Sequence, residues 1–184
     1  MVEHLEKTVG EFEAQIEAAL EPFRGVIERL VTIPGVSETA ASVIVAEIGV
    51  DMQRFPTVGH LISWAGLCPG LNQSAGKVKS RTLRDGAPWL KTVLVQCAWA
   101  AVRNKHNYLH VQFLRLRARR GPKKAILAVA ASILTAAFYV LRDQVPYRDL
   151  GPLYFASLDQ ERIAQRLAHR IKELGYEVEI RKAA

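Results

Sequence analysis

One segment of the sequence combines a hydroxyl group with amides and cations at close spacing. It runs Asn72-Gln73-Ser74-Ala75-Gly76-Lys77 and is followed by Lys79, Arg81 and Arg84. A serine among small residues can approach a phosphodiester closely, and its hydroxyl could attack phosphorus while amides and cations hold the non-bridging oxygens. No general base is near it in the sequence. The segment therefore fits a Ser74 nucleophile with Lys77, Lys79, Arg81 and Arg84 around the strand, or an ordinary polar loop.

Other reactive centres are not indicated. Cys68 and Cys97 lack a CxxC pairing or a histidine at zinc spacing, which argues against a disulfide framework or a structural metal and favours a reducing, cytoplasmic setting. The histidines are dispersed, and residues 67–150 contain three carboxylates, Asp85, Asp143 and Asp149. We therefore predict no metal site in this chain and no self-contained two-metal nuclease. Walker A and GxGxxG patterns are also absent from the sequence, which disfavours nucleotide hydrolysis.

The charge is distributed unevenly along the 184 residues, whose formal net charge is +7. Residues 1–66 have 4 Lys/Arg against 10 Asp/Glu, a net charge of −6. Residues 67–150 have 15 against 3, a net charge of +12. A polyanion is the natural partner of such a basic block, because each phosphate that it neutralises releases condensed counterions. We expect the cations to include Arg115, Arg119, Lys123 and Lys124, although a solvated basic face would have the same composition.

The serine segment lies between predicted helices. Residues 67–86 are punctuated by Pro, Gly, Asn and Ser and have no helical period, which predicts a long loop. Asp85 as N-cap and Pro88 in the first turn predict the start of the next helix. Further helices are expected over 108–119 and 123–142, and the second is apolar almost all round, as a central core helix is. It is too short and too polar to predict a membrane span.

The two ends of the chain are predicted to be amphipathic helices. Apolar residues alternate three and four apart from Val2 to Leu30, which is the pattern of a coiled-coil seam, and Pro22 should kink or restart this helix. We expect it to self-associate through Leu5, Phe12, Ile16 and Phe23, and we expect a further segment before Met1. The last helix, about 159–174, should bury Ile163, Leu167, Ile171 and Leu174 and precede a short strand at 177–180.

A hairpin is predicted where Ile33-Pro34-Gly35 ends one helix and Ser37 or Thr39 caps the next. This resembles a helix-hairpin-helix element, in which backbone N–H groups beside Gly35 could bind a DNA phosphate. A purely structural αα-hairpin would have the same turn. The fold class is therefore all-α: a coiled-coil-like helix over 1–29, a compact helical domain over 30–152 containing the hairpin and the serine loop, and a C-terminal helix and tail over 153–184.

The order of short motifs adds a family resemblance. They are Leu30-Val-Thr-Ile-Pro-Gly-Val, Ala46-Glu-Ile-Gly, Ala65-Gly-Leu-Cys-Pro-Gly with Gln73-Ser74, Arg84-Asp-Gly-Ala-Pro-Trp-Leu-Lys, Gln96-Cys-Ala-Trp-Ala, Arg119-Arg-Gly-Pro-Lys-Lys-Ala and Pro146-Tyr-Arg-Asp-Leu-Gly. In this order and spacing, from about Leu30 to the C-terminus, the chain resembles the C-terminal domain of the IS-one-ten family of insertion-sequence transposases.

The resemblance implies a DNA transposase or recombinase domain, bacterial or archaeal and nucleoid-associated. It implies that the family's nucleophilic serine is Ser74, with Ala75 standing where Gly is usual. It also implies a RuvC-like N-terminal domain, absent here, that would bind Mg²⁺ through acidic ligands, and a bridge RNA that selects DNA. Two alternatives remain open: a non-catalytic nucleic-acid-binding and dimerisation module, and a protein–protein assembly module without nucleic-acid affinity.

Overall fold

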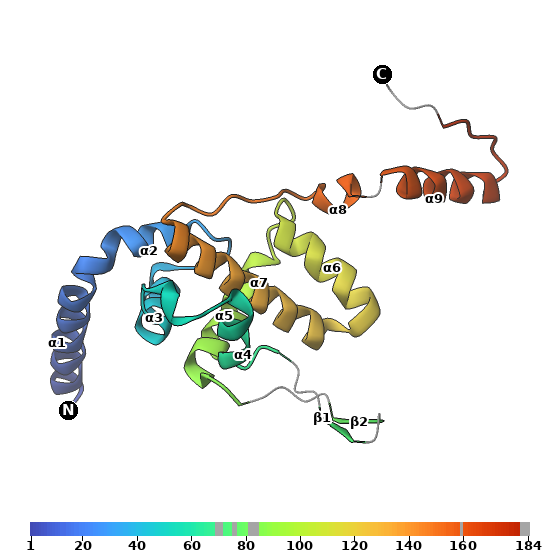
Figure 1. Cartoon of the computed structure of the whole chain (residues 1–184). Helices are drawn as coiled ribbons and strands as arrows, with labels where there is room; N and C mark the ends of the chain where they lie inside the picture. Colours follow the sequence, from blue (N-terminus) through green and yellow to red (C-terminus); the bar gives the residue numbers. More distant parts are fainter. Residues whose placement is uncertain (69–71, 75–76, 81–84, 159, 181–184) are drawn as a thin grey trace.

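The computed structural model describes residues 1–68, 72–74, 77–80, 85–158 and 160–180. Apart from one short strand pair, the regular structure is helical, which confirms the all-α prediction (Figure 1). In chain order the elements are α1 Val2–Leu20, the 3₁₀ turn η1 Glu21–Phe23, α2 Arg24–Val31, α3 Glu38–Ile48, the 3₁₀ turn η2 Met52–Arg54, α4 Val58–Trp64, β1 Asn72–Ser74, β2 Lys77–Ser80, α5 Pro88–Ala101, α6 Tyr108–Arg120, α7 Pro122–Asp143, α8 Tyr154–Ser157 and α9 Gln160–Glu173.

Helix α7 forms the centre of the body. It packs against α5 and α6 over much of its length and also contacts α2 and α4. Val129, Ile133 and Leu134 are completely buried along it. By length and composition α7 could cross a membrane, with a mean hydropathy of 2.0, but 56% of that stretch is buried by the rest of the chain. A core helix has the same composition, and α7 has the neighbours of one.

The N-terminal seam divides into an exposed half and a buried half. Leu5 and Phe12 on α1 are each 59% exposed. After Pro22, which lies in the 3₁₀ turn η1, the same apolar row enters the core through Ile27 and Leu30. The predicted restart at Pro22 is therefore confirmed. Phe23 is half-buried and packs against the core, so the surface available to a partner is the part of the seam before it.

Helices α2 and α3 form the predicted hairpin, and Gly35 lies in its turn with φ of +84°. Ser37 rather than Thr39 is the N-cap of α3, and its hydroxyl accepts a hydrogen bond from Ala40 N at 3.2 Å. A Cβ on Gly35 would overlap the carbonyl oxygen of Cys97 and lie 2.6 Å from Ala101 N. The turn thus sits directly on the backbone of α5, which explains glycine here by packing. A phosphate contact at Gly35 stays a prediction.

Several local predictions were wrong. The N-cap of α5 is Ala87 and not Asp85, because Pro88 disfavours helical φ/ψ for the residue before it and so places Ala87 in extended conformation. Residues 67–86 are not wholly loop, since β1 and β2 pair within them. Residues 177–180 form no strand. Leu167 and Ile171 on α9 and Leu174 just after it are 53%, 41% and 74% exposed instead of buried, while the side chain of Ile163 lies outside the described residues.

The Gly35 packing generates a stability prediction. Gly35→Ala should lower the free energy of unfolding by roughly 2–4 kcal/mol, because it combines a positive φ with a steric overlap against α5 backbone. Gly10→Ala is the matched control, since no atom lies within 4 Å of a Cβ at this helical position and the change should be neutral or stabilise by up to about 1 kcal/mol. Urea unfolding followed by circular dichroism measures both. Equal stability of the two variants would contradict the packing.

Candidate nucleic-acid interface

The backbone places Ser74 in the short antiparallel strand pair. Strand β1 ends at Ser74 and β2 begins at Lys77, and these two residues are cross-strand partners. Gln73 pairs with Val78, and a register irregularity separates Asn72 from Gln73. The predicted loop cations Arg81 and Arg84 lie outside the described residues. The hairpin therefore brings together Ser74 and Lys77 among the sequence-predicted residues, with Lys79 further along β2.

The other predicted cations gather where α6 meets α7. We call this cluster the basic corner; it consists of Arg115, Arg117, Arg119, Arg120, Lys123 and Lys124, all of them exposed. Gly121, with φ of +80°, ends α6 and Pro122 begins α7, so a single residue connects the two helices. This short connection concentrates cations from both helix ends at one place. In Figure 1 the corner and the strand pair both lie on the side of the body away from α1.

Buried contacts hold α6 in place at its start. The Asn107 side chain is 4% exposed; its Oδ1 accepts a hydrogen bond from His110 N at 2.7 Å, and its Nδ2 donates to Ala101 O at 2.9 Å. The His110 ring nitrogen Nδ1 lies 2.6 Å from Val102 O. Phe113 packs edge-on against Trp99 with ring centroids 5.8 Å apart. Because α6 is held against α5 in this way, the backbone of the basic corner has a defined position.

Aromatic side chains hold part of the corner. The Arg115 guanidinium lies 4.4 Å from the ring centroid of Phe155, and Tyr108 stacks on the same ring at 5.1 Å. Arg117 lies 5.6 Å from the Phe113 centroid. Arg115 therefore contacts α8 and is also exposed, a contact that the sequence did not predict. These contacts place α8 on the flank of α6.

Sequence reasoning omitted Arg117 and Arg120 from the candidate residues. Arg117, Arg119 and Arg120 occupy the last turn of α6, where the helix dipole favours cations. Lys123 and Lys124 lie in the first turn of α7. The density of cations between Arg115 and Lys124 would have identified the two missing arginines. Four of the ten residues in this segment are arginine and two are lysine.

The remaining nucleophilic and acidic groups offer no alternative centre. Burial raises the pKa of the Cys97 thiol to about 11, so it stays protonated and unreactive near neutral pH. Asp149 accepts hydrogen bonds from Tyr108 N at 3.1 Å and Gly151 N at 2.6 Å, and Asp143 pairs with Arg142 at 2.6 Å. Within the described part of the chain, no three His, Cys, Asp or Glu side chains are grouped as a metal site would need.

Comparison of the sequence with known proteins identifies a family to which this chain is similar. Residues 27–113 match the model of the transposase IS116/IS110/IS902 family. A protein of insertion element IS110 from Streptomyces coelicolor is 33% identical over 144 residues, which cover 76% of this chain and 34% of that protein. Over these stretches the chain is similar to proteins of the IS116/IS110/IS902 transposase family.

A second relative has the same kind of similarity. A protein from Sinorhizobium fredii named as a transposase is 26% identical over 126 residues, which cover 66% of this chain and 32% of that protein. The chain therefore spans about a third of the length of the curated relatives that it matches. No solved structure matches it. The stretch matched by the family model contains the α2–α3 hairpin, the Ser74 strand pair and the first half of α6.

The basic corner generates a binding prediction. Affinity for duplex DNA should fall steeply with salt, and replacing Arg115, Arg119 and Lys123 with Ala should reduce the slope of log K against log salt by roughly 0.9 for each lost phosphate contact. The charge-matched control replaces Lys7, Arg24 and Arg54, exposed cations outside the corner, and should leave the slope unchanged. Fluorescence anisotropy titrations between 50 and 200 mM salt, roughly the range over which such contacts lose affinity, measure this. Salt-independent binding, or equal effects of both triples, would refute the assignment.

Proposed function

We propose that this chain is the DNA-handling part of a transposase or recombinase in which Ser74 attacks a DNA phosphodiester. The observation that carries the proposal is the family match over residues 27–113, because that stretch includes the strand pair carrying Ser74. The basic corner supports it independently, since six exposed cations suit a phosphate backbone. DNA is the proposed substrate, and a guide RNA, by the family resemblance, is a proposed second partner.

The proposed step is a transesterification at phosphorus. A bond forms between Ser74 Oγ and phosphorus while a phosphorus–oxygen bond to deoxyribose breaks, and the serine proton must be removed as the sugar oxygen takes one up. The product is a phosphoserine link, and its reversal on another strand end would rejoin DNA. Cations near the strand, with Lys77, Lys79, Arg81 and Arg84 as the proposed set, would hold the non-bridging oxygens.

The described residues do not fit a Mg²⁺ site of their own. Asp143 and Asp149 are engaged by Arg142 and by backbone N–H groups, and no carboxylate cluster forms in the described part of the chain. We propose that the metal belongs to an acidic RuvC-like segment outside this chain. The short coverage of the relatives, about a third of their length, leaves room for such a segment in a complete protein.

A second candidate function is a non-catalytic module that binds nucleic acid and dimerises. The exposed basic corner and the exposed half of the α1 seam favour it, because neither requires a reaction at Ser74. The two candidates differ in the consequence of removing one hydroxyl group: the module would lose nothing, whereas the recombinase would lose its covalent step.

The serine generates the decisive prediction. The isolated chain should not cleave DNA. In a complete protein, Ser74→Ala should abolish the covalent protein–DNA adduct, which is resolved on a denaturing gel. The affinity of this variant for nucleic acid should stay within about threefold of the parent's, because one hydroxyl contributes little to a multi-phosphate contact. Ser80→Ala, in strand β2 of the same hairpin, is the matched control and should form the adduct normally. Undiminished adduct in Ser74→Ala would move the nucleophile to Ser80 or Thr82.

The exposed part of the α1 seam generates a prediction about assembly. We propose that it self-associates, since Leu5, Phe12 and Ile16 would otherwise leave a large apolar stripe in water. Leu5→Glu with Phe12→Glu should therefore give a folded species of lower mass in sedimentation velocity. Ala14→Glu with Ala18→Glu adds the same charge on the other side of α1 and should leave the mass unchanged. A parent chain that is monomeric at high concentration would contradict the proposal.

A further inference from the structure

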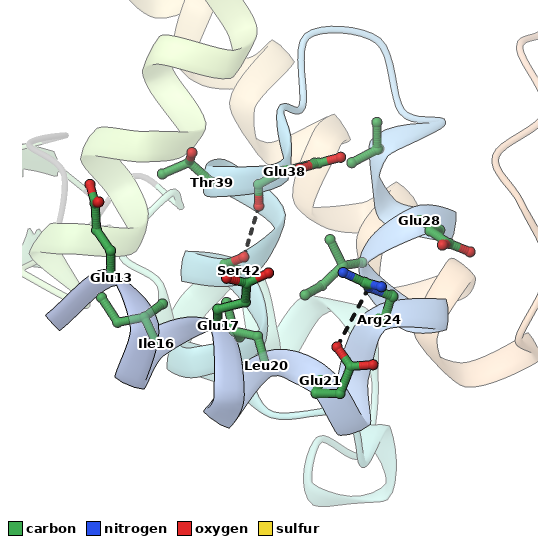
Figure 2. A pocket seen from close by; sticks show the side chains of 12 residues that line it. Glu13, Ile16, Glu17, Leu20, Glu21, Arg24, Glu28, Glu38, Thr39 and Ser42 are labelled. Atoms are coloured by element: carbon green, nitrogen blue, oxygen red, sulfur yellow. Dashed lines mark hydrogen bonds and ion pairs between the residues drawn. The ribbon is translucent and has the colours of Figure 1, made fainter. Parts of the chain in front are cut away.

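An acidic groove lies at the end of the molecule opposite the basic corner (Figure 1). It has a volume of about 770 Å³ and lies between α1, α2 and α3. Figure 2 shows Glu13 and Glu17 from α1 with Glu38 from α3 at its edges. Arg24 is the one cation among the described lining residues, and it pairs with Glu21 at 3.7 Å. The groove is therefore strongly negative.

The floor of the acidic groove is apolar and has nothing packed on it. Ile16 is 56% exposed and Val31 is 37% exposed. On α1, Ile16 and Leu20 form an apolar row, and Glu13 and Glu17 form an acidic row beside it at four-residue spacing, which Glu21 continues at the start of η1. An apolar row bordered by one sign of charge is the surface on which an amphipathic helix of the opposite sign docks.

Helix α9 has the complementary pattern. Leu167, Ile171 and Leu174 form an exposed apolar row, with exposed fractions of 53%, 41% and 74%. Arg166 and Arg170 follow the neighbouring row at four-residue spacing, and both are exposed. Like charges disfavour pairing of two copies of α9 along these rows, whereas the opposite charges of α9 and the groove attract. The two surfaces are therefore complementary in charge and in apolar pattern.

The helix of the same copy is held away from its own groove. Phe155 on α8 lies between Tyr108 and Arg115 of α6, at 5.1 and 4.4 Å. Helix α9 begins directly after α8, and Figure 1 shows it at the end of the molecule far from α1. A second copy can present α9 without disturbing these contacts. Two copies can do so reciprocally, as two-fold symmetry requires.

We propose that α9 of one copy docks in the acidic groove of a second copy, and that the second copy returns the same contact. The two docked helices run parallel. On α1 each residue of the acidic row comes one residue after a residue of the apolar row, whereas on α9 each residue of the basic row comes one residue before a residue of the apolar row. In a facing pair these rows lie on the same side only in the parallel orientation, as the e and g positions do in parallel coiled coils. This contact uses Ile16 and Leu20 with the groove glutamates, whereas pairing of two α1 seams would use Leu5, Phe12 and Ile16. Because both contacts need Ile16, one copy of α1 makes only one of them at that position.

The test reverses each half of the contact. One full-length variant has Glu13→Lys and Glu17→Lys, and the other has Arg166→Glu and Arg170→Glu; all four side chains are exposed. Each variant alone should dimerise at least about tenfold more weakly in sedimentation equilibrium, because both of its contacts become repulsive. A 1:1 mixture should dimerise nearly as well as the parent chain, since each reversed groove meets a reversed α9. The charge-matched control, Arg103→Glu with Lys105→Glu, should behave as the parent does.

Four outcomes would overturn the proposal. The first is a parent chain that stays monomeric, and the second is an α9 variant that dimerises normally. The third is a mixture that dimerises as weakly as each variant alone, and the fourth is an α9 variant that loses nucleic-acid affinity without any change of mass. The second would indicate pairing of α1 seams alone, the third an intramolecular contact, and the fourth a nucleic-acid role for α9. Circular dichroism confirms that the variants fold, and the milder substitutions to Gln at the same four positions should weaken dimerisation partially.

Discussion

Close packing of α7 against α5 and α6 is the constraint on which the other surfaces depend. Ala125, Ala130 and Ala137 are completely buried along α7, and such small side chains let neighbouring helices approach closely. One end of α7 meets α6 at the basic corner, and the other end contacts α2. The distance between the cationic surface and the acidic groove is therefore set by one helix of 22 residues.

This arrangement makes the molecule electrically polar. The segment before residue 67 has a net charge of −6, and the segment from 67 to 150 has +12. The fold keeps the two separate: Glu13 and Glu17 border a groove at one end, and Arg119 and Lys123 lie at the other. A DNA duplex, the proposed substrate, would be drawn to one end and repelled from the other, so charge would orient the encounter before any specific contact forms.

Sequence predicted those features that depend on neighbours in the chain. The helix over 108–119 ends in the structure at Arg120, and the one over 123–142 spans 122–143, because glycine and proline mark their shared boundary. Four of the six cations of the basic corner were predicted for the same reason, since they lie within ten residues of one another. The contact of Gly35 with Cys97 joins residues far apart in the chain, and the acidic groove combines three helices, so neither could be predicted. The apolar period of α9 correctly predicted a helix, but a period alone does not show what packs against the apolar face.

The position of Lys123 and Lys124 has a consequence for how binding is coupled to stability. Both lie in the first turn of α7, where the helix macrodipole is positive and each cation costs about 0.3–1 kcal/mol. The packing of α7 offsets this cost, so the unbound protein retains an unfavourable charge–dipole interaction in its central helix. A phosphate bound at the corner, as proposed, would remove that unfavourable interaction and make the same lysines favourable. Part of the free energy of such binding would then be the relief of a repulsion already present in the fold.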